Sequence, residues 1–65
     1  MYPYIVLYRI ESIMSVLDAP FGFRCLAENS DQAEEQCLNA YPDCAVVWVE
    51  VGESYEKALQ SYWHE

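Results

Sequence analysis

The sequence predicts a small α+β domain in which three strands and two helices follow the order β-β-α-β-α. Two runs rich in β-branched and aromatic residues open the chain, and a third apolar run lies between two segments with apolar residues at helical spacing. The 65 residues form one domain, residues 1–65, which buries only about 60% of its unfolded surface. We therefore expect a three-stranded antiparallel sheet with both helices covering one face.

The first predicted strand spans residues 2–11, YPYIVLYRIE. Alternation along a strand assigns its side chains to two faces. One face carries Tyr4, Val6, Tyr8 and Ile10, and the other carries Ile5, Leu7, Arg9 and Glu11. The next segment, SIMSVLD over residues 12–18, suits a helical turn or a continued strand equally well until Pro20 interrupts it.

The second predicted strand spans residues 21–28, FGFRCLAE, and pairs with the first as a wide hairpin. It alternates between Phe21, Phe23, Cys25 and Ala27 on one face and Gly22, Arg24, Leu26 and Glu28 on the other. A helix follows, capped by Asn29 or Ser30 and ended by Pro42, with Asn29 and Gln32 as a capping-box-like pair. Its apolar stripe is Ala33, Cys37, Ala40 and Tyr41.

The apolar run CAVVWVEV, residues 44–51, is typical of a central strand, and Gly52 ends it. A second helix within residues 53–65 is capped by Glu53 or Ser54. Its stripe is Tyr55, Ala58, Leu59, Tyr62 and Trp63. A third strand reached through one helix runs parallel to the second and antiparallel to the first, which favours the strand order 2-1-3.

Charge is the outlying property of the composition. Eleven Asp and Glu residues oppose three Lys and Arg, which gives a formal net charge of -8. Nucleic acid and anionic membranes are unsuited as direct partners because both require a basic face. A positively charged protein surface is the expected partner class. We recognise no signal peptide and no apolar stretch of about 20 residues, so we expect a cytoplasmic location.

Catalytic motifs are missing from the sequence. His64 is the only histidine and is the penultimate residue, so an enzyme would need a cleft around it or around Cys44. Cys25, Cys37 and Cys44 form no CxxC and are expected to be buried free thiols, with one pair able to bridge under oxidising conditions. No zinc or calcium spacing and no glycine-rich phosphate loop occurs. We expect no enzymatic activity, no cofactor and no metal.

The carboxylates form two groups, one in the stretch ENSDQAEEQ at residues 28–36 and one around residues 43–56. The helix dipole favours first-turn acids such as Asp31, but three basic residues are too few to pair the remainder. We predict a partner-binding surface made of Glu28, Asp31, Glu34, Glu35, Asp43, Glu50, Glu53 and Glu56. A face shared by both groups would favour mimicry of nucleic-acid phosphates, and a scattered arrangement would favour mere solubility.

The many aromatic residues suggest a different function. If both helices cover one sheet face, Trp48 lies with Val46 on the open face, where it would suit a protein–protein adaptor or assembly module. Alternatively, the aromatic residues fill the core on both sides of the sheet.

The short length, the β-β-α-β-α order and the acids of ENSDQAEEQ and VEVGESYEK are similar in character to anti-CRISPR proteins of phage or mobile-element origin. Inhibitors of type I effector complexes, type I-C among them, are the group that the chain resembles. The resemblance implies a non-enzymatic inhibitor in the bacterial host cytoplasm. Such a protein would occupy the basic surface on which the effector receives target DNA.

Overall fold

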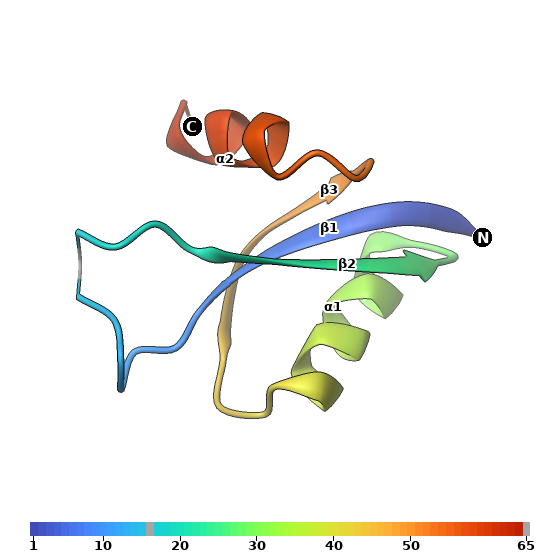
Figure 1. Cartoon of the computed structure of the whole chain (residues 1–65). Coiled ribbons are helices and arrows are strands. Elements are labelled where there is room, and N and C mark those ends of the chain that lie inside the picture. Colours follow the sequence, from blue (N-terminus) through green and yellow to red (C-terminus); the bar gives the residue numbers. More distant parts are fainter. Residues whose placement is uncertain (16, 65) are drawn as a thin grey trace.

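The computed structural model describes residues 1–15 and 17–64 of the chain. Its elements follow the predicted order β-β-α-β-α (Figure 1). They are β1 (Tyr2–Arg9), β2 (Phe21–Ala27), α1 (Ser30–Ala40), β3 (Ala45–Val51) and α2 (Tyr55–Trp63). The strands form one antiparallel sheet in the order β2-β1-β3, which confirms the predicted fold class and strand order.

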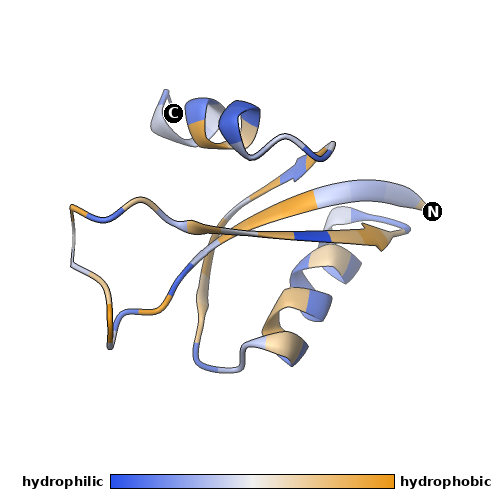
Figure 2. Cartoon of the chain, in the orientation of Figure 1, coloured by the Kyte–Doolittle hydropathy of each residue, from blue (hydrophilic) through white to orange (hydrophobic). Residues whose placement is uncertain are grey.

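The two helices lie on opposite faces of the sheet, so the prediction that both cover one face is wrong (Figure 1). α1 packs on a cluster that contains Tyr4, Val6 and Tyr8, whereas α2 packs on Ile5 and Leu7. Successive strand residues point to opposite faces, so β1 supplies apolar side chains to both layers. Figure 2 shows the hydrophobic middle of β1 passing between the two helices.

β1 occupies the centre of the sheet, which corrects the assignment of the apolar run 44–51 to a central strand. Residues 4–8 of β1 are all buried, while β3, at the edge, contains only half-buried and exposed residues. A continuous apolar run indicates that other elements pack on both faces of the strand. An edge strand with a helix on either side meets that condition, so the run does not distinguish edge from centre.

The start of α1 agrees with the sequence. Asn29 is the N-cap, and its Oδ1 accepts a hydrogen bond of 2.8 Å from the backbone N–H of Gln32. The side chain of Gln32 accepts in turn from the backbone N–H of Glu28 at 2.8 Å, one residue before the usual capping-box partner. The reciprocal pair therefore joins the end of β2 to the first turn of α1.

The predicted helical stripes are only partly buried. In α1, Ala33 and Cys37 are fully buried, and the C-cap Tyr41 stacks on Tyr8 with ring centroids 5.0 Å apart, but Ala40 is exposed. In α2, only Ala58 is fully buried, while Tyr55, Leu59 and Tyr62 are half-buried and Trp63 is exposed. The second helix thus covers its face less completely than the first.

α2 is attached to the sheet at its first turn. Oγ of the N-cap Ser54 accepts from the backbone N–H of Lys57 at 3.2 Å. The hydroxyl of Tyr55 donates to the carbonyl of Pro20. A Cβ at Gly22 would lie 2.6 Å from Cδ1 of Tyr55, so glycine is required where the ring crosses β2.

A β-bulge in β3 changes the predicted position of Trp48. Leu7 lies opposite Trp48 but Tyr8 lies opposite Val46, so Val47 is an extra residue in the edge strand. Val47 and Trp48 consequently both pack with the α2 layer, and Val46 packs with the α1 layer. The prediction that Trp48 and Val46 share one open face is wrong because the bulge interrupts the two-residue alternation.

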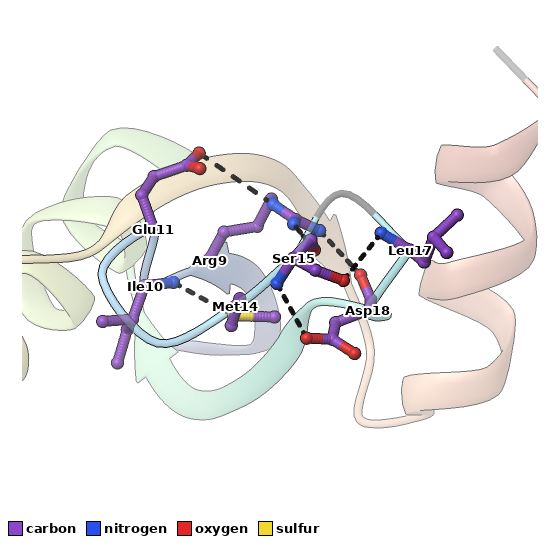
Figure 3. A network of polar contacts seen from close by, with 7 residues as sticks. All are labelled: Arg9, Ile10, Glu11, Met14, Ser15, Leu17 and Asp18. Carbon is purple, nitrogen blue, oxygen red and sulfur yellow. Dashed lines mark hydrogen bonds and ion pairs between the residues drawn. The ribbon is translucent and has the colours of Figure 1, made fainter.

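Between β1 and β2, the described residues form turns at residues 11–13 and 17 and no helix or strand, whereas a helical turn or a continued strand was expected for residues 12–18. Val16, within that segment, lies outside the described residues. Arg9 organises the segment by donating from Nη1 to the carbonyl of Asp18 at 2.7 Å and from Nη2 to the carbonyl of Ser15 (Figure 3). Asp18 Oδ2 accepts from the backbone N–H of Ser15 at 2.9 Å.

Candidate functional site

Both helices begin at the same end of the sheet. Ala27 at the end of β2 is opposite Tyr2, and Val51 at the end of β3 is opposite Tyr4. The backbone N–H of Gly52 donates to the carbonyl of Pro3 at 2.9 Å, which closes this end (Figure 1). Four of the predicted acids flank or begin the two helices here, and we call them the acidic end: Glu28, Asp31, Glu53 and Glu56.

The other four predicted acids are distributed over the molecule. Glu34 and Glu35 lie further along α1, and Asp43 follows the far end of that helix. Glu50 lies on β3, opposite Ile5 of the α2 layer. The two acidic groups of the sequence therefore do not share a face of the sheet, and the distribution of these four acids is the scattered arrangement expected for solubility. Only the four acids of the acidic end bring residues of both groups to one end of the sheet.

The predicted acids are not neutralised by the basic residues of the chain. Among residues 1–15 and 17–64, the only ion pair joins Arg9 Nε to Glu11 at 4.0 Å, and Glu11 is not one of the eight. Arg24 donates from Nε to the backbone carbonyl of Glu53 at 2.8 Å, so it supports the acidic end through the main chain. Seven of the eight acids are exposed, and Glu50 is half-buried.

An aromatic pocket lies on the α2 side of the sheet and was missed by sequence reasoning. Its volume is about 570 Å³. β3 and α2 contribute Trp48, Tyr62 and Trp63, while β1 and the following loop contribute Arg9, Leu17 and Asp18. The aromatic residues were predicted as strand and stripe positions, but only the fold of the loop brings Leu17 and Asp18 against them.

The three cysteines lie together on the α1 side of the sheet. They are free, and Sγ of Cys37 is 3.9 Å from Sγ of Cys44. Burial, followed by the hydrogen bond with Cys44, raises the pKa of the Cys37 thiol to about 12. Burial also raises the pKa of Cys25. Raised pKa values keep both thiols protonated at neutral pH and therefore weakly nucleophilic.

The only histidine is in a different layer from these thiols. His64 is the C-cap of α2, and the cysteines pack with the α1 layer on the other face of the sheet. The described residues thus do not assemble a Cys–His pair. In the same part of the chain, no group of three or more His, Cys, Asp and Glu side chains is arranged to hold a metal ion.

Comparison of the chain with protein-family models, characterised proteins and solved structures found no significant match. No helix within residues 1–15 and 17–64 has the length and apolar character needed to cross a membrane.

Proposed function

We propose that this protein is a non-enzymatic inhibitor that binds a basic protein surface through its acidic end. The observation that carries the proposal is the absence of internal partners for the acids. Seven of the eight predicted contact residues are exposed, and none of the eight is in an ion pair within the described residues. Uncompensated like charge destabilises a small fold, and the same charge attracts a positively charged partner over long range.

The acidic end combines carboxylates from both acidic groups of the sequence. Asp31 and Glu56 lie in the first turns of their helices, where the dipoles stabilise them without any partner. Glu28 and Glu53 lie outside the helices and add charge beyond what the dipoles favour. Together they present carboxylates from both sides of the sheet to a partner that approaches its end.

The partner class follows from the charge and from the resemblance to anti-CRISPR proteins. Basic surfaces wide enough to attract a chain of net charge -8 are typical of nucleic-acid-binding proteins. A type I CRISPR effector complex, such as type I-C, is the proposed target in the bacterial host cytoplasm. Carboxylates would replace DNA phosphates on the effector, and target DNA would be excluded without a chemical step.

A competition experiment tests this proposal directly. Target DNA is bound to a type I-C effector complex, and displacement by the protein is followed by electrophoretic mobility. Charge reversal at the acidic end, Glu28→Lys with Glu53→Lys, is expected to weaken inhibition at least about tenfold. The matched control, Glu11→Lys with Glu65→Lys, makes the same change in net charge outside the eight predicted contact residues and is expected to weaken it at most about threefold.

Two further measurements define the contact surface. Glu34→Lys with Glu35→Lys asks whether the contact extends along α1, and weakening comparable to that at the acidic end would place these residues within it. Inhibition should also decline as salt is raised, because screening weakens exposed charge pairs. Equal inhibition by the acidic-end and control variants, or indifference to salt, would contradict the proposal.

A second candidate function, the protein–protein adaptor, is favoured by one observation. Trp63 exposes 62% of its surface and lines the aromatic pocket with Trp48. Trp48 is not on an open sheet face, so an adaptor would have to use this pocket. The adaptor function predicts that Trp63→Ala weakens partner binding more than charge reversal at the acidic end does.

A further inference from the structure

Aromatic side chains from β3 and α2 surround the pocket. Trp48 and Tyr62 lie with ring centroids 6.3 Å apart at an interplanar angle of 59°, and the largely exposed Trp63 lines the same hollow. At about 570 Å³, its volume falls within the range of roughly 300–1,000 Å³ that is usual for ligand pockets. A surface hollow lined by two tryptophans and a tyrosine is large enough to enclose a side chain of another molecule.

Carboxylates border these aromatic rings. Asp18 lines the pocket, and Trp48 Nε1 donates to Oε1 of Glu50 at 3.3 Å. This hydrogen bond holds the Glu50 carboxylate at the edge of the Trp48 indole. Aromatic faces and nearby carboxylates both attract cations, and the net charge of -8 adds to that attraction.

Arg9, the only basic residue that lines the pocket, is already engaged. Its two terminal nitrogens donate to the carbonyls of Ser15 and Asp18, and its Nε lies 4.0 Å from Glu11 (Figure 3). Two carbonyl dipoles and one carboxylate therefore offset its charge. Through these two hydrogen bonds Arg9 holds the turn that carries Asp18, so its donors are used within the loop and the pocket stays suited to a further cation.

We propose that the aromatic pocket binds the guanidinium group of an arginine side chain on a partner protein. A guanidinium is flat, so it can stack on an indole face while it donates hydrogen bonds to the Asp18 carboxylate that lines the pocket. Lysine lacks the planar group, and a neutral apolar side chain gains nothing from the Asp18 carboxylate. The choice of a basic partner protein rests on the proposed function, but the test below uses the isolated protein and needs no partner.

The test is a titration of the ¹⁵N-labelled protein with blocked tripeptides of the sequence Gly-X-Gly, followed by the indole N–H resonances of Trp48 and Trp63. With arginine at X, saturable shifts of both resonances are expected. Citrulline, the neutral isostere of arginine, is expected to bind about tenfold more weakly or not at all. Lysine is expected to bind at least about threefold more weakly than arginine.

Matched variants assign the binding to the pocket. Trp63→Ala is expected to weaken arginine-peptide binding at least about fivefold, and Trp63→Phe, which keeps an aromatic face, by less. Tyr2→Ala removes an aromatic ring of similar exposure, 60%, at the other end of the sheet and is expected to leave binding unchanged. Both positions are exposed, so these variants should fold.

Three results would overturn the inference: no saturable shift with arginine, equal binding of citrulline and arginine, or tighter binding of a peptide with leucine or phenylalanine at X. Because the titration uses only the isolated protein, its failure leaves the DNA-competition result standing. Failure of the competition assay likewise leaves the titration standing.

Discussion

The two faces of the sheet are covered to different degrees. On the α1 face, the fully buried Ala33 and Cys37 lie against the sheet, and the helix contacts all three strands. On the α2 face, the shorter helix packs mainly on β1 and β3 and leaves Leu26 of β2 56% exposed. The pocket lies beside this second helix. The comparison indicates that the α1 face chiefly supplies stability, while the α2 face keeps aromatic surface available for contact.

Side-chain size explains the difference. Ala33 and Cys37 are small, so α1 lies close to the sheet, and Tyr41 extends the cover by stacking on Tyr8. α2 instead meets the sheet through Tyr55, Leu59 and Tyr62. Large side chains hold a helix further from the strands and leave hollows between them unless neighbouring residues fill the space. Here Leu17, in the loop after β1, stays 93% exposed, so the hollow beside α2 remains open.

The largest expected effect is at the central strand, which serves both faces. Leu7 is fully buried in the α2 layer, so Leu7→Ala should lower the free energy of unfolding by about 2–5 kcal/mol in urea denaturation. The matched control, Leu26→Ala on an exposed position of β2, should change it by less than about 0.5 kcal/mol. Similar losses for the two variants would mean that the α2 face has no buried core.

A smaller loss is expected from Gly22→Ala, which tests how closely α2 approaches β2. The new Cβ would lie 2.6 Å from Cδ1 of Tyr55, whose hydroxyl is held by the carbonyl of Pro20. Overpacking of this kind should lower the free energy of unfolding by about 1–3 kcal/mol. In a Tyr55→Ala background the loss should largely disappear, and a double-mutant cycle measures this coupling. Additive effects of the two substitutions would contradict the close approach.

The α1 face should make stability sensitive to alkaline pH. Burial raises the pKa of Cys37 to about 12, whereas an unfolded thiol has a pKa of about 8.5. The unfolded state therefore loses its proton first, and stability that is fully present below about pH 8.5 declines as the pH rises toward 12.

This decline is measured by urea denaturation between about pH 8 and pH 10. That window lies at or below the usual tyrosine pKa of about 10, and thus precedes most of the contribution of Tyr8, whose pKa burial raises to about 12. Cys37→Ala should reduce the dependence of the unfolding free energy on pH. An unchanged dependence in that variant would show that Cys37 is not the responsible group.

The smallest effect on stability is expected at the rim of the pocket. Trp63 is exposed, so Trp63→Ala should change the free energy of unfolding by less than about 0.5 kcal/mol, although it removes one of the largest side chains. Thermal unfolding followed by circular dichroism measures this change. A loss above about 2 kcal/mol would show that Trp63 belongs to the core and would remove the contrast between the two faces.

Much of the fold was predictable from local pattern. The alternation in residues 2–9 and 21–27 assigned the strand faces correctly, and Asn29 and Ser54 cap their helices as expected. The acids of the candidate site were identifiable by composition, but their grouping was not. It depends on the strand order, which brings the starts of both helices to one end of the sheet.

The sequence by itself determined the order of the elements, the two faces of β1, the helix caps and the excess of carboxylates, because each depends on neighbouring residues or on composition. Only the tertiary structure decided which face each helix covers, the position of Trp48 and the presence of the aromatic pocket. The bulge at Val47 shifts by one residue which sheet face each side chain of β3 points to, and the pocket brings Trp48 of β3 together with Tyr62 of α2 and Asp18 of the loop. Such contacts join residues that are distant in the chain, and local spacing carries no information about them.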